Sequence, residues 1–252
     1  MVFPISDDNS DLRTTPFVNW ALIAVNLFVF AALQRFGNNE RFTFAWATVP
    51  EKIRTGHNID REVTVRDPIT GREQIIPEEP TPLSVYLTLF TSMFMHANFL
   101  HIFGNMLYLW VFGDELEANY LGPVRFTIFY FICGLLAGFM QIAVNPTSTE
   151  PNLGASGAIA GVLGGFQVIF PRDRILVYIF PFWHVRITAL LLTGFWFILQ
   201  LQSGIGSITG STQTQGGVAY FAHIGGFIAG MLLVKLIGIG VRPVGGQDYE
   251  QL

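Results

Sequence analysis

The stretch Ala222-His-Ile-Gly-Gly-Phe-Ile-Ala-Gly230 decides the fold, because it places a small residue at every fourth position of an apolar segment. Small residues at this spacing form a smooth helix face on which a second helix packs closely, as is common in membrane bundles. Another apolar segment carries the matching series Gly157, Gly161 and Gly165. We therefore expect two closely packed helices, with His223 bordering the face that they share.

The composition indicates that the surroundings of these helices are lipid. Of the 252 residues, 51% are hydrophobic and only 13% are charged, whereas about 25% are charged in ordinary soluble domains. The formal net charge of -4 includes no basic stripe, which argues against a nucleic-acid partner. Cys133 is the single cysteine, which excludes an intrachain disulfide and a thiolate metal cluster.

Six stretches approach the roughly 20 apolar residues that a membrane-crossing helix needs. The sequence therefore predicts an all-α polytopic membrane protein, a bundle of six helices over residues 17–240. The expected helices are Phe17 to Gln34, Asn98 to Phe112, Val124 to Val144, Ser156 to Phe170, one within Ile175 to Gln202 that starts near Arg186, and Val218 to Ile239.

Basic residues in the short loops predict the orientation of the bundle, since such residues concentrate on the cytoplasmic side. Arg125, Arg172, Arg174 and Arg186 lie on one side, which we expect to be cytoplasmic together with the tails at residues 1–16 and 241–252. A compact chain with short tails favours a bacterial inner membrane.

The remaining polar stretch, residues 36–81, is then an exterior loop. Within it, residues 61–76 alternate apolar and polar side chains on both sides of Asp67-Pro-Ile-Thr-Gly71, which predicts a small β-hairpin.

Ser156 is a candidate nucleophile because it follows a loop rich in Pro, Asn and Gly and opens an apolar helix. The free N–H groups and the positive end of a helix favour a developing anion at such a position. Gly154 and Gly157 would allow a substrate carbonyl to approach the backbone closely. Serine is equally a favoured helix N-cap, so this motif alone leaves both interpretations open.

Polar side chains inside membrane spans are functional candidates by default. The close packing of the two glycine-faced helices would bring the imidazole of His223 near the Ser156 hydroxyl, as an activated nucleophile requires. His101 and Asn105 share one helix face and can donate hydrogen bonds to an oxyanion, or can join helices as a polar pair. His96 lies at or just before that helix start.

Two other functions compete for these polar residues. A metal site would use His96, His101 and His223, but no carboxylate set of the usual spacing lies near them, so we expect no metal ion there. A transporter or channel would also suit intramembrane histidines, but the spans lack interior carboxylates. Flux assays in liposomes would separate a transporter from an enzyme.

Together these motifs resemble the rhomboid family of intramembrane serine proteases. The matching stretches are His96-Ala-Asn-Phe-Leu-His101-Ile-Phe-Gly-Asn105, Gly154-Ala-Ser156-Gly157 and Ala222-His223-Ile-Gly-Gly226 with Gly230, in this order on the second, fourth and sixth spans. Phe112-Gly-Asp-Glu-Leu-Glu117 and Gly122-Pro-Val-Arg-Phe126 also look like the family's short second loop. The resemblance extends over about residues 17 to 240.

The resemblance implies a Ser156–His223 dyad, with an oxyanion hole formed by His101, Asn105 and the Ser156 N–H. It also implies that transmembrane protein substrates reach the site laterally past the fifth span, without a cofactor. Two positions depart from patterns known in the family. Ala160 stands where some members place an aromatic residue that stacks on the base, and Ala47 follows Trp46 where some have arginine. An inactive rhomboid-like protein that binds membrane clients is the alternative function.

Overall fold

The computed structural model describes residues 2–6, 12–59, 63–66, 73–76, 79–179, 183–209 and 219–241. This part of the chain is mostly helical, but two small sheets show that the expected all-α class is too narrow. The helical elements are α1 (Phe17–Phe28), η2 (Val29–Leu33), α2 (Glu40–Trp46), α3 (Pro50–Thr55), η3 (Val85–Leu87), α4 (Thr88–Thr91), η4 (Ser92–Phe94), α5 (Phe99–Glu115), η5 (Leu116–Leu121), α6 (Gly122–Val144), α7 (Ser156–Ile169), α8 (Ala189–Thr209) and α9 (Tyr220–Ile237).

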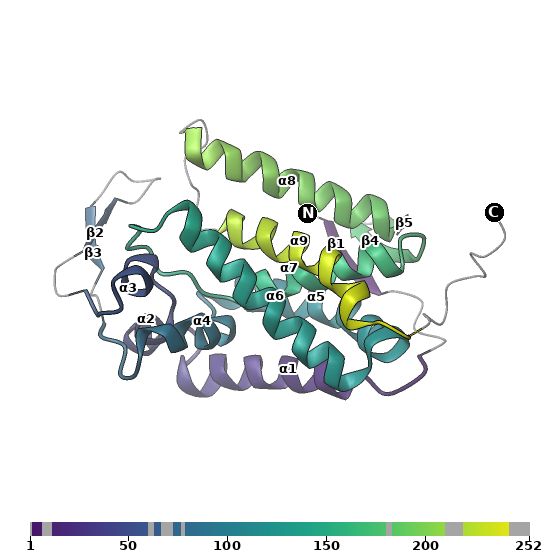
Figure 1. Ribbon diagram of the computed structural model, residues 1–252, viewed down its shortest axis with the longest axis horizontal. Helices are drawn as coiled ribbons and strands as arrows, with labels where there is room; N and C mark the ends of the chain where they lie inside the picture. The colour runs from purple at the N-terminus through teal and green to yellow at the C-terminus, as the bar shows by residue number, and fades with distance from the viewer. Residues whose placement is uncertain are drawn as a thin grey trace.

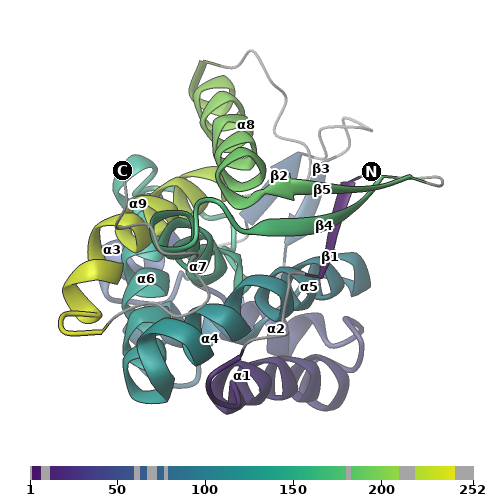
Figure 2. The same cartoon turned by 90° about the vertical axis from the view of Figure 1, so that its right-hand side faces the viewer.

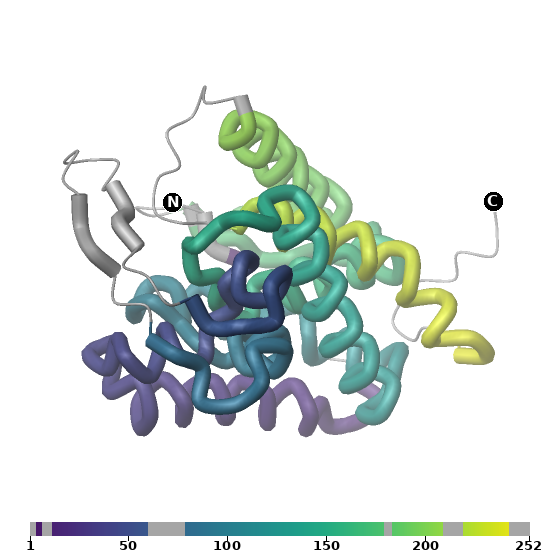
Figure 3. The backbone as a smooth tube through the Cα atoms, turned by 60° about the vertical axis from the view of Figure 1, so that its left-hand side comes forward, coloured from purple at the N-terminus to yellow at the C-terminus, as the bar shows by residue number. Residues whose placement is uncertain are grey.

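The centre of the bundle is the pair α7 and α9, and α6 packs against both. Figures 1 and 3 show α1 and α8 on opposite sides of this centre. A side chain at Gly226 would collide with the carbonyl oxygen of Gly157, and one at Gly230 with that of Gly161. The backbones of α7 and α9 therefore lie as close as the glycine series predicts.

The lengths of the apolar helices bear on how many of them cross a membrane. Among the described residues, three stretches are long and apolar enough to span it, namely Phe99–Val144, Ala189–Ile208 and Tyr220–Ile237. The first of these contains both α5 and α6, between which Gly122 adopts a φ of 71°. Shorter apolar helices cover Phe17–Leu33, Val85–Phe94 and Ser156–Ile169. Several apolar helices thus fit a membrane bundle of the rhomboid type, and the number of six spans remains a prediction.

A three-stranded antiparallel sheet combines two strands from the segment before α8 with one strand from the start of the chain. Its strands are β1 (Val2–Ser6), β4 (Arg174–Ile179) and β5 (Trp183–Thr188), in the order β1-β4-β5. The expectation that the fifth helix starts near Arg186 was wrong, because Arg186 pairs with Leu176 in this sheet and the helix begins at Ala189. Residues in this segment are largely β-branched or aromatic, which favours strands. Figure 2 shows the sheet beside the start of α8.

The N-terminal segment that we expected to be a tail contributes one of these strands. Residues Val2, Phe3 and Pro4 are partners of Ile179, Tyr178 and Val177 in the register of β1 with β4. The C-terminal tail, from residue 242 onward, lies outside the described residues.

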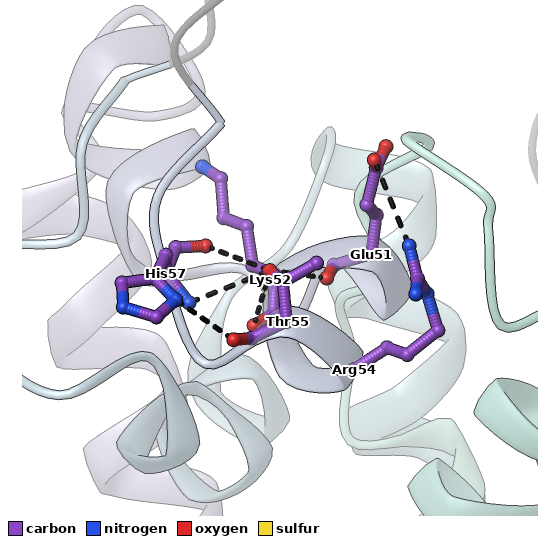
Figure 4. Close-up of polar contacts among 5 residues, drawn as sticks. All are labelled: Glu51, Lys52, Arg54, Thr55 and His57. Atoms are coloured by element: carbon purple, nitrogen blue, oxygen red, sulfur yellow. Dashed lines mark hydrogen bonds and ion pairs between the residues drawn. The ribbon is translucent and has the colours of Figure 1, made fainter.

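The loop between η2 and η3 carries two short helices and the second sheet. Strands β2 (Val63–Arg66) and β3 (Glu73–Ile76) pair antiparallel, and the turn expected at residues 67–71 lies outside the described residues. In Figure 1 these strands lie at the opposite end of the bundle from β4 and β5. At the end of α3, the His57 Nδ1 donates to the Thr55 carbonyl oxygen at 2.8 Å (Figure 4). His57 thus serves the local structure of the loop.

Candidate functional site

Ser156 is the first residue of α7, and Gly154, two residues earlier, has a backbone conformation that favours glycine. Gly154 has a φ of 121°, a conformation that residues with a side chain rarely adopt. The first hydrogen bond within the helix joins Ile159 N to the Ala155 carbonyl at 3.0 Å. The N–H groups of the preceding residues in the turn, including that of Ser156, therefore have no acceptor in the helix.

His223 lies in the first turn of α9 and contacts Ser156 directly. Its Nε2 is 2.8 Å from the Ser156 Oγ, and its Nδ1 is 2.8 Å from the Gln200 Oε1. An amide oxygen only accepts, so Nδ1 carries the proton and Nε2 is free to accept from the serine hydroxyl. The two predicted residues thus meet in the orientation that a nucleophile and its base require.

The backbone at His223 is fixed from a third helix. The Ala222 N–H donates to the Gln141 Oε1 of α6 at 3.2 Å. The N–H groups of Ala222 and His223 also lie 3.0 and 3.3 Å from the Ala219 carbonyl oxygen. The imidazole therefore projects from a turn whose backbone is held by hydrogen bonds to Gln141 of α6 and to Ala219.

His101 and Asn105 of α5 face the loop that leads to Ser156. A Cβ built at Gly154 would lie 2.8 Å from the His101 Nε2 and 3.6 Å from the Asn105 Nδ2. The His101 Nδ1 accepts from the Ala97 N–H at 3.4 Å, which leaves the proton on Nε2. Two donors thus converge beside Gly154, two residues before Ser156, where only glycine leaves them room.

Asn105 carries a donor that nothing in the described part of the chain uses. The residue is 7% exposed, and its Nδ2 has no hydrogen-bond partner among the described residues. A buried donor without a partner is costly, since its lost hydration is not replaced. Such a group is available for the oxygen of a bound substrate.

His96 is fully buried next to His101. Its ring centroid is 5.2 Å from that of His101, in an edge arrangement. The amide of Gln34 binds its backbone at both ends, through Gln34 Nε2 to His96 O at 2.8 Å and His96 N to Gln34 Oε1 at 2.9 Å. Neither ring nitrogen has a partner among the described residues. His96 therefore lies next to His101, and its ring makes no hydrogen bond to any of the described residues.

Hydrogen bonds join the loop before α7 to Thr48, in the segment between η2 and η3, and to Ser92 at the start of η4. Thr48 and Asn152 exchange two backbone hydrogen bonds of 3.0 and 2.7 Å. The Gly154 N–H donates to the Ser92 carbonyl at 2.8 Å, and the Thr48 hydroxyl lies 2.9 Å from that of Ser92. These contacts fix the backbone that presents Ser156.

Two further residues of the site, Trp196 and Gln200, lie on α8 and were not predicted from the sequence. The Trp196 ring centroid is 5.7 Å from that of His223, and the planes are inclined by 38°. Trp196 thus lies beside the imidazole of His223. Gln200 is a polar residue in an apolar helix, four positions after Trp196 and hence on the same face. That signal was present in the sequence.

The described residues include no cluster of side chains that could hold a metal ion. No group of three or more His, Cys, Asp or Glu side chains converges there. His96 and His101 approach each other, whereas the second ring nitrogen of His223 faces Gln200.

Several known proteins are similar to this chain in sequence. A family model described as "Rhomboid domain" matches residues 84–239. Rhomboid protein 1, mitochondrial, of Saccharomyces cerevisiae is 33% identical over 150 residues, which are 58% of this chain and 40% of the yeast protein. RHOMBOID-like protein 1 of Arabidopsis thaliana is 28% identical over 243 residues, 86% of this chain and 54% of that protein.

A third relative is shorter in its match. The presenilin-associated rhomboid-like protein, mitochondrial, of Mus musculus is 32% identical over 92 residues, which are 36% of this chain and 24% of the mouse protein. The chain thus spans about half the length, or less, of these curated relatives. Because the family model covers more than half of the chain and the helices are apolar, this membrane protein belongs to the rhomboid family.

Proposed function

We propose that this protein is an intramembrane serine endopeptidase that cleaves transmembrane proteins. The observation that carries the proposal is the 2.8 Å contact between Ser156 Oγ and His223 Nε2, in a chain of the rhomboid family. Neither client binding nor ion transport needs a hydroxyl in contact with the basic nitrogen of an imidazole. An activated serine needs that contact.

The reaction would begin with attack of Ser156 Oγ on the carbonyl carbon of the scissile peptide. As the Oγ–C bond forms, His223 Nε2 takes the hydroxyl proton and the carbonyl oxygen becomes negative. The donors on His101 Nε2, Asn105 Nδ2 and Ser156 N would stabilise that oxygen. The imidazolium would then give its proton to the leaving amine as the peptide C–N bond breaks.

A water molecule would complete the cycle by hydrolysing the acyl-enzyme, with His223 again as the base. The substrate must be unwound near the site, because a carbonyl in an intact helix is already hydrogen-bonded and shielded. We propose that the substrate helix passes α8, which lies at the side of the bundle (Figure 1). Gly157, Gly226 and the other interface glycines would hold Ser156 and His223 at their distance during this step.

The proposed orientation places the site toward the exterior face and both termini in the cytoplasm. The bacterial inner membrane remains a prediction, and two of the three relatives above, from yeast and mouse, are named as mitochondrial. We therefore propose a multi-pass membrane protein, and localisation experiments would identify whether it lies in an organelle or a cell membrane.

Proteolysis can be tested with the purified protein in liposomes, using transmembrane reporters with helix-destabilising residues near one end. The wild-type protein should release fragments cut within or next to the apolar segment, and Ser156→Ala should release none. Ser84→Ala is a matched control at an exposed serine before η3 and should cleave normally. Equal fragments from wild type and Ser156→Ala would refute the mechanism.

A further inference from the structure

We propose that Gln200 is a positioning residue that holds His223 in its catalytic tautomer and orientation, an inference that rests on the proposed protease function. The Gln200 Oε1 lies 2.8 Å from the His223 Nδ1, on the side of the ring opposite to Ser156. Ser156, His223 and Gln200 thus form a line of hydrogen bonds across α7, α9 and α8. The amide takes the place that a carboxylate occupies in a triad.

The chemistry of the amide oxygen explains what this contact does. A neutral imidazole carries one proton, which is on either Nδ1 or Nε2. If the proton were on Nε2, the ring would donate to Ser156 Oγ and would accept nothing from it. An acceptor at Nδ1 selects the other tautomer, so that Nε2 keeps a lone pair for the serine proton.

The orientation of the ring depends on the same helix. Trp196, one turn before Gln200 on α8, lies against the imidazole, and the Trp196 ring also lies 6.1 Å from that of Phe227. Gln141 of α6 holds only the backbone at Ala222, so the side chain of His223 is held from α8. The base is therefore aligned while α8 lies against α9, and an outward movement of α8 would remove its acceptor.

The test compares three variants by the rate of fluorophosphonate labelling and by kcat and KM for a transmembrane reporter. Gln200→Met has nearly the same length but no amide oxygen, and we expect it to lower the labelling rate and kcat by about fivefold to 100-fold with little change in KM. Gln200→Glu restores an oxygen acceptor and should stay within about threefold of wild type. Gln202→Met is the matched control on an exposed position of α8 and should behave as wild type.

The outcomes separate this proposal from the proposed function. Labelling of wild type together with full activity of Gln200→Met would overturn the role of Gln200 and leave the protease intact. A slow Gln200→Glu that is as impaired as Gln200→Met would also overturn it, because the acceptor would then not be what matters. Failure of folded wild type to label or cleave would refute the protease, and with it the role of Gln200. If Gln200→Met lost so much thermal stability that its unfolded fraction accounted for the lower rate, the role of Gln200 would be structural, and this result would likewise contradict the proposal.

Discussion

The two sides of His223, which we propose to be the catalytic base, contact very different parts of the molecule. On one side, α7 and α9 meet through glycines whose backbones touch, and they fix Ser156 and His223 at 2.8 Å. On the other side, α8 supplies Trp196 and Gln200 but shows most of its apolar surface to the exterior of the bundle. Its exposed residues include Leu190, Leu191, Phe195, Ile198, Ile205 and Ile208.

This difference suits two separate tasks: the α7–α9 pair would hold the reacting atoms in place, and α8 would admit the substrate. An interface of touching backbones cannot open without losing its packing, because interiors are close-packed and tolerate little displacement. A peripheral helix that contacts the bundle through fewer buried residues can move at a lower cost. Ser156 and His223 thus lie on the closely packed pair α7 and α9. Trp196 and Gln200, which we propose align the imidazole, lie on α8, past which we propose that substrates move.

Among variants that keep both Ser156 and His223, the largest effect is expected from Asn105→Ala on α5. Loss of one oxyanion donor should lower kcat by about 100- to 1000-fold. Because the Asn105 Nδ2 has no partner among the described residues, thermal stability in detergent should hardly change. Measured kcat near the wild-type value would exclude Asn105 from the oxyanion hole, and a collapse of stability would show that it joins helices instead.

The same substitution on each side gives the sharpest contrast in stability. Gly230→Ala on α9 pushes a methyl group into the Gly161 carbonyl and should cost about 1 to 3 kcal/mol. Gly194→Ala on α8 meets no atom within 4 Å and should be neutral or stabilise by about 0.5 to 1 kcal/mol. Unfolding in detergent at graded temperatures measures both, and equal effects would contradict the contrast between the two interfaces.

A disulfide between α8 and α9 tests whether movement of α8 admits substrates. A Cβ at Gly204 would lie 3.5 Å from the Tyr220 Cβ, within the range of about 3.5–4.5 Å for disulfides. In a Cys133→Ala background, oxidised Gly204→Cys/Tyr220→Cys should cleave reporters at least about tenfold more slowly than the reduced form. Labelling by the small fluorophosphonate should persist in both forms. Equal cleavage before and after reduction would contradict passage beside α8 at this level.

Trp196→Leu should have the smallest effect on activity. The packed ring contact is worth about 0.5 to 1.5 kcal/mol, so we expect kcat to fall by roughly twofold to tenfold. Trp183→Leu on β5 is the control, since Trp183 is 70% exposed and far along the chain from the base. A loss as large as that of Asn105→Ala would mean that Trp196 does more than orient the imidazole.

Local patterns in the sequence predicted most of the long apolar helices and the contact between Ser156 and His223. The spacing of Gly157 and Gly161 against Gly226 and Gly230 reports a close approach directly, because only glycine fits it. The i, i+4 spacing of His101 and Asn105 likewise places both donors on one helix face. Such features depend on one or two segments and need no knowledge of the whole fold.

Features that depend on distant segments were missed. The strands β4 and β5 form an apolar run that also suits a helix, and periodicity alone does not separate these cases. Their pairing with β1 joins Val2 to Ile179, a contact that no local pattern reports. Gln200 acquires its role only because α8 lies against α9, although its polarity in an apolar helix was a usable signal.

The most direct test of the catalytic pair is to map the adduct that a fluorophosphonate forms with the purified, folded protein. Mass spectrometry of the labelled wild type should place the adduct on Ser156, and His223→Ala should label far more slowly or not at all. An adduct on another serine, no adduct on folded wild type, or equal rates for wild type and His223→Ala would contradict an activated Ser156–His223 pair.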